Sequence, residues 1–192
     1  MPFIFNLLMT LTIAVVTGLG SVWLAVRDGA GIEIARDGPW EAWISAGNPD
    51  ADPYTKAMLA RTGRIPMASG EAINFRATTD SNGDRLAGNC SYLIVGGELD
   101  SRWWTLTVTD ESERLIENIA SRYAFNSIDV LRNNDGSFNI QLAPTAQSGN
   151  WIPTGGRQSL IMTLRLYDTP MISNGNIENP NLPRIVRGEC ES

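Results

Sequence analysis

Residues 103–109 read WWTLTVT, and this stretch decides the fold class. Trp104, Leu106 and Val108 alternate there with Trp103 and three threonines. Successive side chains of an extended chain point to opposite faces, so one face of this segment is apolar and the other is polar. The alternation predicts a β-strand that buries one face in a core, as strands of antiparallel sheets commonly do.

The same two-residue period recurs on both sides of this stretch. Further strands are expected at residues 72–78, 92–95, 127–131, 137–142 and 160–167. Asn82-Gly83 and residues 133–136 have turn sequences of the kind that join such strands. Residues 111–120 are expected to form a short helical turn. Several short alternating strands separated by turns predict a mainly β fold, an antiparallel, jelly-roll-like β-sandwich with one or two short helices.

One helix is expected outside this pattern, at residues 53–63. Asp52 is suited to cap its first turn, because a carboxylate accepts hydrogen bonds from the free N–H groups there. Pro53 suits the first helical position, where the missing N–H costs nothing. Gly63 then marks the end of the helix.

The first thirty residues have a different character. The run from Ile4 to Val26 is apolar except for one asparagine, a few hydroxyl side chains and two glycines. As a helix it spans about 34 Å, enough to cross a hydrocarbon core of about 30 Å. A cleaved signal peptide would need a basic segment before the run and small residues near its end. Neither is present, since Val22-Trp23-Leu24 occupies that position, so a retained transmembrane anchor is expected.

Two observations favour opposite orientations of this anchor. Arg27 and Arg36 follow the helix while no basic side chain precedes it, which favours a cytoplasmic C-terminal domain under the positive-inside rule. Cys90 and Cys190, in contrast, are the only cysteines and have no metal-binding spacing. A disulfide between them would close a loop of about 100 residues, worth up to about 4.7 kcal/mol in the chain-entropy model. Because disulfides persist in oxidising compartments, we expect a bridged, exported domain, with two reduced thiols as the alternative.

Composition narrows the classes of chemistry. The chain has 192 residues, a net charge of −6, one lysine (Lys56) and no histidine. The missing histidine excludes Ser-His-Asp and Cys-His nucleophilic sites and His-ligated metal sites. The acidic balance argues against nucleic acid as a partner, because phosphate binding needs a concentrated basic face. No metal and no cofactor are expected, and any catalysis would have to use carboxylates, tyrosine, Lys56 or arginine.

Seven short segments carry a family resemblance. They are 52–61 (DPYTKAMLAR), 71–72 (EA), 103–107 (WWTLT), 122–126 (RYAFN), 134–137 (NDGS), 150–153 (NWIP) and 164–167 (LRLY). Each segment alone is unspecific, but the ordered set, between Trp40 and Asp168, resembles the bacterial family known as domain of unknown function 1214.

This resemblance implies a β-sandwich exported to the cell envelope. Short members are similar to this chain in having one N-terminal membrane segment. Longer members join the domain to a partner, the domain of unknown function 1254, which is expected to be absent here. The resemblance implies no reaction, because the family has no settled activity.

Two groups of residues are candidate ligand contacts. Asn150 and Trp151 could offer a hydrogen-bonding arm and a stacking platform to a sugar-like or aromatic ligand, or could instead plug the end of the sandwich and close a turn. Arg165 and Tyr167 lie on the strand face opposite the leucines, and Glu71 is a candidate partner for the arginine. These three would bind a carboxylate or hydroxylated ligand, unless the arginine is simply solvated.

These observations predict one architecture and leave function open. Residues 1–27 are expected to be the anchor, 28–38 a linker and 39–192 the β-sandwich domain, held at the bacterial inner membrane with the domain in the periplasm. The leading expectation is a ligand-binding or protein-interaction module rather than an enzyme. The alternatives are a carbohydrate-active hydrolase or lyase that uses carboxylate and tyrosine chemistry, and a small accessory subunit of a membrane complex, with a membrane protein as partner.

Overall fold

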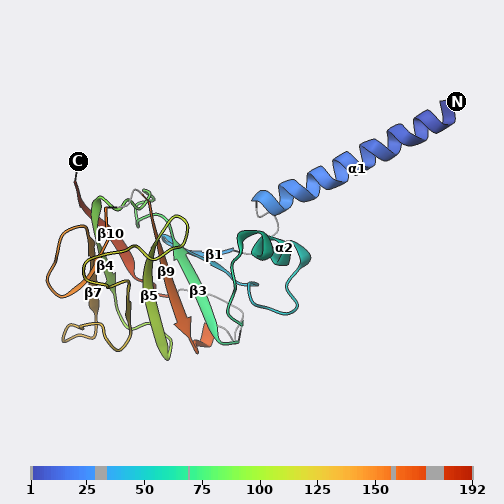
Figure 1. Cartoon of the computed structure of the whole chain (residues 1–192). Helices are drawn as coiled ribbons and strands as arrows, with labels where there is room; N and C mark the ends of the chain where they lie inside the picture. Colours follow the sequence, from blue (N-terminus) through green and yellow to red (C-terminus); the bar gives the residue numbers. More distant parts are fainter. Residues whose placement is uncertain (1, 29–33, 69, 157–158, 172–179, 192) are drawn as a thin grey trace. The chain divides into compact units, whose positions relative to one another are not determined.

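The computed structural model describes residues 2–28, 34–68, 70–156, 159–171 and 180–191. The chain divides into two compact units, one formed by Met1–Glu33 with Ser45–Ala68 and the other by Ile34–Ile44 with Ser69–Ser192. The first unit contains helices α1 (Pro2–Asp28) and α2 (Pro53–Thr62), and the second contains the described strands (Figure 1).

Helix α1 (Pro2–Asp28) contains the whole apolar run from Ile4 to Val26. It is the one helix of the described residues that is long and apolar enough to cross a membrane, and its side chains are almost all exposed. Its hydroxyl groups bond back to the helix's own carbonyl oxygens. These bonds are Thr10 to Asn6 at 2.8 Å, Thr12 to Leu8 at 2.8 Å, Thr17 to Ile13 at 2.7 Å and Ser21 to Gly18 at 2.8 Å.

Helix α2 (Pro53–Thr62) confirms the second helix prediction and its caps. The Asp52 carboxylate accepts hydrogen bonds from the N–H groups of Tyr54 and Thr55, at 2.8 and 3.1 Å. The hydroxyl of Thr55 also donates to this carboxylate, and this bond is the largest cause that holds the pKa of Asp52 below its ordinary value, followed by the bond from the Thr55 N–H. Gly63 ends the helix in the left-handed conformation, with φ of 68°.

The larger sheet has six strands in the order β1-β2-β3-β9-β5-β6, and all its pairs are antiparallel. The bounds are β1 Ile34–Asp37, β2 Trp40–Trp43, β3 Ala72–Ala77, β5 Trp103–Asp110, β6 Ala124–Asn126 and β9 Leu160–Tyr167. Strand β9 lies between β3 and β5 although it is the last of these strands in sequence (Figure 1).

The smaller sheet has four strands in the order β10-β4-β7-β8. The bounds are β4 Cys90–Gly96, β7 Phe138–Ala143, β8 Asn150–Pro153 and β10 Arg184–Cys190. Strands β7 and β8 pair in parallel, which departs from the antiparallel expectation. The other two pairs are antiparallel, and a disulfide between Cys90 and Cys190 joins β4 to β10, as the cysteine count predicted.

The two sheets enclose one core, which confirms the β-sandwich. The ring of Trp104 in β5 stacks on the ring of Phe138 in β7, with centroids 4.9 Å apart. Leu106 and Val108 of β5 are buried beside Trp104, as the alternation in residues 103–109 predicted. Their polar neighbours lie on the opposite face and are mostly half-buried.

Two predicted elements are wrong. Residues 127–131 form a turn instead of a strand, because the Oδ1 atom of Asn126 accepts the N–H groups of Ile128 and Asp129 and pulls the chain out of the sheet. Residues 111–120 contain no helix. There the Asp110 carboxylate accepts the N–H group of Arg114, which closes a tight loop.

Five of the described strands were not predicted: β1, β2, β6, β8 and β10. Strand β1 lies within residues 28–38, the stretch expected to be a linker. Three of the five, β1, β6 and β8, have three or four residues and lie at sheet edges, where one face is not consistently buried and the two-residue period is too short to detect.

Candidate functional site

One edge of the sandwich is hollowed where β6 of the larger sheet approaches β8 of the smaller sheet. Arg122, just before β6, donates a hydrogen bond from Nη1 to the carbonyl oxygen of Trp151 in β8, at 3.2 Å. A depression of about 350 Å³ opens there. We call it the edge depression, and its lining consists of Arg122, Ala124, Phe125, Asp129, Leu131, Gly149 and Asn150.

Asn150 holds the wall of the edge depression together. Its Oδ1 accepts the N–H of Leu131, and its Nδ2 donates to the carbonyl oxygens of Leu131 and Asn139, each at 2.8 Å. The residue is 6% exposed. Both N–H groups of the amide are therefore used inside the fold, where Asn150 ties residue 131 to β7.

Trp151 is also bound into the fold. It is half-buried, and its Nε1 donates to the carbonyl oxygen of Ala143 at 3.1 Å. Its own carbonyl oxygen receives the Arg122 hydrogen bond, so the residue joins β8 both to β7 and to the segment before β6.

Two charged side chains line the edge depression. Arg122 is exposed, and its guanidinium carbon lies 5.6 Å from the ring centroid of Phe125. Asp129 is exposed, and its Oδ2 accepts a hydrogen bond from Asn126 Nδ2. Within the described ranges neither charge takes part in an ion pair, so the edge depression presents one positive and one negative group to solvent.

Arg165 and Tyr167 lie elsewhere, on the face of the larger sheet that points away from the core. Tyr167 is opposite Trp103 of β5, and the two rings are 4.8 Å apart at a tilt of 42°. Arg165 is opposite Asn74 of β3 and Thr105 of β5. These side chains are half-buried and form a polar and aromatic surface.

The structure does not gather the five predicted contacts into one place. Asn150 and Trp151 are in the smaller sheet, whereas Arg165 and Tyr167 are in the larger sheet. Glu71 is exposed, and its carbonyl oxygen accepts the N–H of residue 168 at 3.0 Å. Among the described residues no ion pair joins Glu71 to Arg165.

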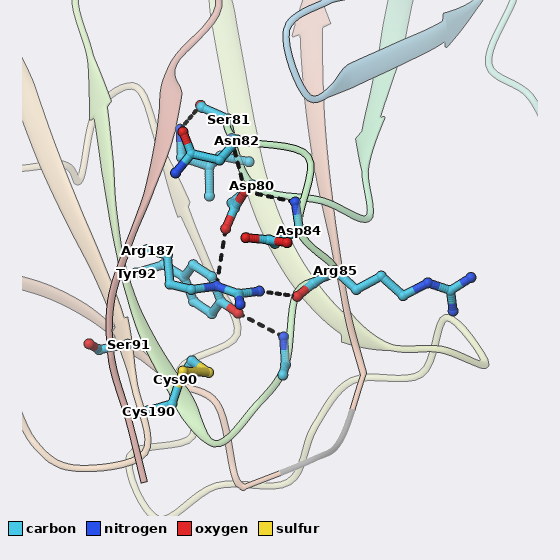
Figure 2. Close-up of polar contacts among 12 residues, drawn as sticks. Asp80, Ser81, Asn82, Asp84, Arg85, Cys90, Ser91, Tyr92, Arg187 and Cys190 are labelled. Carbon is cyan, nitrogen blue, oxygen red and sulfur yellow. Dashed lines mark hydrogen bonds and ion pairs between the residues drawn. A yellow bond between two sulfur atoms is a disulfide. The ribbon is translucent and has the colours of Figure 1, made fainter.

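A buried ion pair between Asp80 and Arg187 was not predicted from the sequence. The Asp80 side chain is fully buried, and its Oδ2 lies 3.0 Å from Arg187 Nε. Its Oδ1 accepts the N–H groups of Asn82 and Asp84, at 2.9 and 3.0 Å (Figure 2). The turn sequence at residues 80–84 was detectable, but the partner on β10 lies more than a hundred residues away.

Arg187 extends this network to β4. Its guanidinium lies over the ring of Tyr92, 5.6 Å from the centroid, and donates to the carbonyl oxygen of Arg85 (Figure 2). The Tyr92 hydroxyl in turn accepts the N–H of Ala87 at 2.8 Å. Every charged group of the network is used in holding β10 against β4 and the loop before it, which indicates a structural role.

A second loop repeats the design of the Asp80 loop. The Asp110 Oδ1 accepts the N–H groups of Ser112 and Arg114, both at 2.9 Å. The hydrogen bond from the backbone of Arg114 is the largest cause that holds the pKa of Asp110 below its ordinary value.

In the part of the chain that the structure describes, no three acidic or cysteine side chains lie close enough to hold a metal ion.

A comparison with a solved structure agrees with this fold. The VPA0106 protein from Vibrio parahaemolyticus has a similar structure, with a TM-score of 0.60 and 19% identity over 73% of this chain and 36% of that one. An uncharacterised protein from Burkholderia cenocepacia gives a TM-score of 0.46 and 16% identity over 93% of this chain and 53% of that one. The chain thus spans about a third and about half of these two proteins. At such identity the Vibrio match shows the fold alone.

No curated protein matches the chain. A family profile, in contrast, matches residues 71–171, which run from the start of β3 past the end of β9 and include the edge depression. This region is more than half of the chain. The chain belongs to the family described as proteins of unknown function DUF1214.

Proposed function

We propose that this chain is a single-pass protein of the bacterial inner membrane, anchored by α1, whose β-sandwich lies in the periplasm and acts as a ligand-binding or protein-interaction module. The observation that carries the proposal is the combination of an apolar helix of membrane-spanning length with a disulfide-linked sandwich. The helix provides the tether and the disulfide favours the oxidising side of the membrane.

The polar groups of α1 support the membrane interpretation. Each of its threonine and serine hydroxyls from Thr10 to Ser21 donates to a carbonyl oxygen one turn earlier. Unsatisfied hydroxyl groups are costly in hydrocarbon, and these bonds remove that cost without a partner helix. At the other end the Arg27 guanidinium lies 5.2 Å from the ring centroid of Trp23, a pair suited to the membrane interface.

The edge depression supports a binding role over catalysis. A glycoside hydrolase of the usual kind needs two carboxyl groups about 5 to 9.5 Å apart across a cleft. The lining of the edge depression includes one carboxylate, Asp129. With no histidine in the chain, a binding module is the interpretation that these side chains favour.

Topology mapping tests the anchor and the orientation together. Alkaline phosphatase is active only after export, whereas green fluorescent protein exported unfolded stays dark, so each is fused after residue 192 of the full chain. We expect phosphatase activity, no fluorescence, and a fusion that stays in the membrane after alkaline carbonate extraction. Fluorescence without phosphatase activity would place the sandwich in the cytoplasm, and release by carbonate would contradict the anchor.

A further inference from the structure

We infer that the edge depression binds the end of an uncharged oligosaccharide chain. The inference deepens the proposed function, on which it rests, by naming the class of ligand that the module takes. Three features carry it: the balance of charge in the lining, the fixed position of Arg122, and the apolar surface next to both charges.

The position of Arg122 is fixed by its neighbours. Its backbone N–H donates to Asn118 Oδ1 at 3.1 Å, and its carbonyl oxygen accepts from Asn118 Nδ2 at 3.0 Å. The guanidinium is held by the Trp151 carbonyl oxygen on one side and by the ring of Phe125 on another. A guanidinium has five N–H donors, so several remain for hydroxyl and ring oxygens of a ligand.

Asp129 supplies the complementary acceptor. Its backbone N–H and its Oδ2 are both used by the side chain of Asn126, which fixes the turn that presents the carboxylate. Among the described residues its Oδ1 accepts no hydrogen bond. A carboxylate oxygen of this kind accepts hydroxyl protons, and hydrogen bonds to a charged acceptor are the stronger ones.

The opposite charges of Arg122 and Asp129 decide the charge of the ligand. A phosphate or carboxylate ligand would pair with Arg122 but would be repelled by Asp129, and a cation would meet the reverse arrangement. Sugar hydroxyls both donate and accept, so an uncharged sugar satisfies both groups at once. A small peptide that carries both an ammonium and a carboxylate would also match the two charges, and the test below includes the dipeptide Gly-Glu for this reason.

Apolar surface accompanies the polar groups. The half-buried ring of Phe125 and the side chain of Leu131, which is 66% exposed, belong to the lining. A pyranose ring has an apolar C–H face that packs on such surfaces while its hydroxyls reach outward. The depression of about 350 Å³ is within the usual range for ligand sites and is open to solvent, which suits one end of a longer chain.

The test uses the full chain in detergent micelles, titrated with chitotriose, maltotriose and cellotriose and with the dipeptide Gly-Glu and inorganic phosphate as contrasts. Binding is measured by isothermal titration calorimetry and by saturation-transfer NMR. We expect at least one trisaccharide to bind with a Kd on the order of 1 mM or below. Arg122→Gln and Asp129→Ala should each weaken it about tenfold, because each removes hydrogen bonds to a charged group.

Arg184→Gln and Asp100→Ala are the matched controls, since both residues are exposed and lie outside the lining, and they should leave the Kd unchanged. All four variants are compared by circular dichroism to verify the fold. If no trisaccharide binds, if the two lining variants bind like the wild type, or if Gly-Glu or phosphate displaces the sugar, the saccharide assignment is wrong. In that case an active phosphatase fusion would still support the proposed anchored and exported domain.

Discussion

Gly83 and Glu113 occupy the same place in two loops of one design, those closed by Asp80 and by Asp110. Both have a positive φ, 93° for Gly83 and 60° for Glu113. A Cβ on Gly83 would meet no atom within 4 Å. Gly83→Ala should therefore destabilise the domain by about 1–2 kcal/mol through its backbone alone. Thermal unfolding followed by circular dichroism measures this, with Gly97→Ala, also in open space but without a positive φ, as control.

The Asp80 carboxylate is the buried charge on which β10 depends. Asp80→Ala should lower the free energy of unfolding by about 3 kcal/mol or more, because it leaves Arg187 without its counter-charge and two turn N–H groups without an acceptor. In a double-mutant cycle with Arg187→Gln, the double variant should be less destabilised than the sum of the two single variants. Additive losses would mean that the two side chains are not coupled.

The lowered pKa of Asp110 predicts how the stability of the domain depends on pH. The N–H of Arg114 and the other hydrogen bonds of the loop hold its pKa below the ordinary 3.8, so the folded state binds this proton less readily than the unfolded state. The charged Asp110 therefore stabilises the folded state fully when the pH is above its ordinary pKa. This stabilisation is lost as the pH falls through the lowered pKa. The melting temperature of wild type should exceed that of Asp110→Asn at pH 7, and this difference should shrink below about pH 4. A constant difference would contradict the assignment.

Among the strands, those with a clear two-residue alternation of apolar side chains could be predicted, and those without it could not. Strands β3, β5, β7 and β9 carry alternating apolar residues over at least six positions, and all lie within a residue or two of the predicted ranges. Strand β6 has three residues, too few to show a period. The false strand at 127–131 has apolar residues in alternation, but the side chain of Asn126 competes for the backbone and turns it.

The lining of the edge depression could likewise be predicted only in part from the sequence. Asn150 and Trp151 could be selected as unusual residues in a turn-rich segment, and one of them does line it. Arg122 and Asp129 could not, because they come from segments that meet β8 only in the folded sandwich. Local sequence marks unusual residues, whereas their neighbours across the fold depend on strand order.

The pair β4–β7 depends on one glycine. A Cβ on Gly96 would lie 2.4 Å from the Cζ atom of Phe138, the ring that stacks on Trp104. Gly96→Ala should therefore cost about 1–3 kcal/mol by forcing this ring out of place. The neighbouring Gly97→Ala should cost less in the same unfolding measurement. Adding Phe138→Leu should recover part of the loss, since a shorter side chain leaves room for the methyl group.

For the whole molecule, the Cys90–Cys190 disulfide connects stability with location. It closes a loop that spans 100 positions, so Cys90→Ser combined with Cys190→Ser should lower the free energy of unfolding by up to about 4.7 kcal/mol. The melting temperature of wild type should fall similarly under reductant, while that of the double variant should not change. When cells are quenched with acid and the chain is then unfolded in denaturant, a maleimide should label the cysteines only after reduction. Labelling before reduction would show free thiols and contradict the proposed periplasmic location.

The strand order of the larger sheet also has a consequence for biosynthesis. β9 supplies the middle of that sheet, yet it is the last of its strands to leave the ribosome, and before then β3 and β5 share no neighbour. Small isolated groups of strands are marginally stable, and pairing between distant segments forms slowly. If the segment after the anchor is exported in the order of its sequence, the larger sheet would consequently remain unfolded, the form that a narrow secretion channel accepts, until residues 160–167 had crossed the membrane.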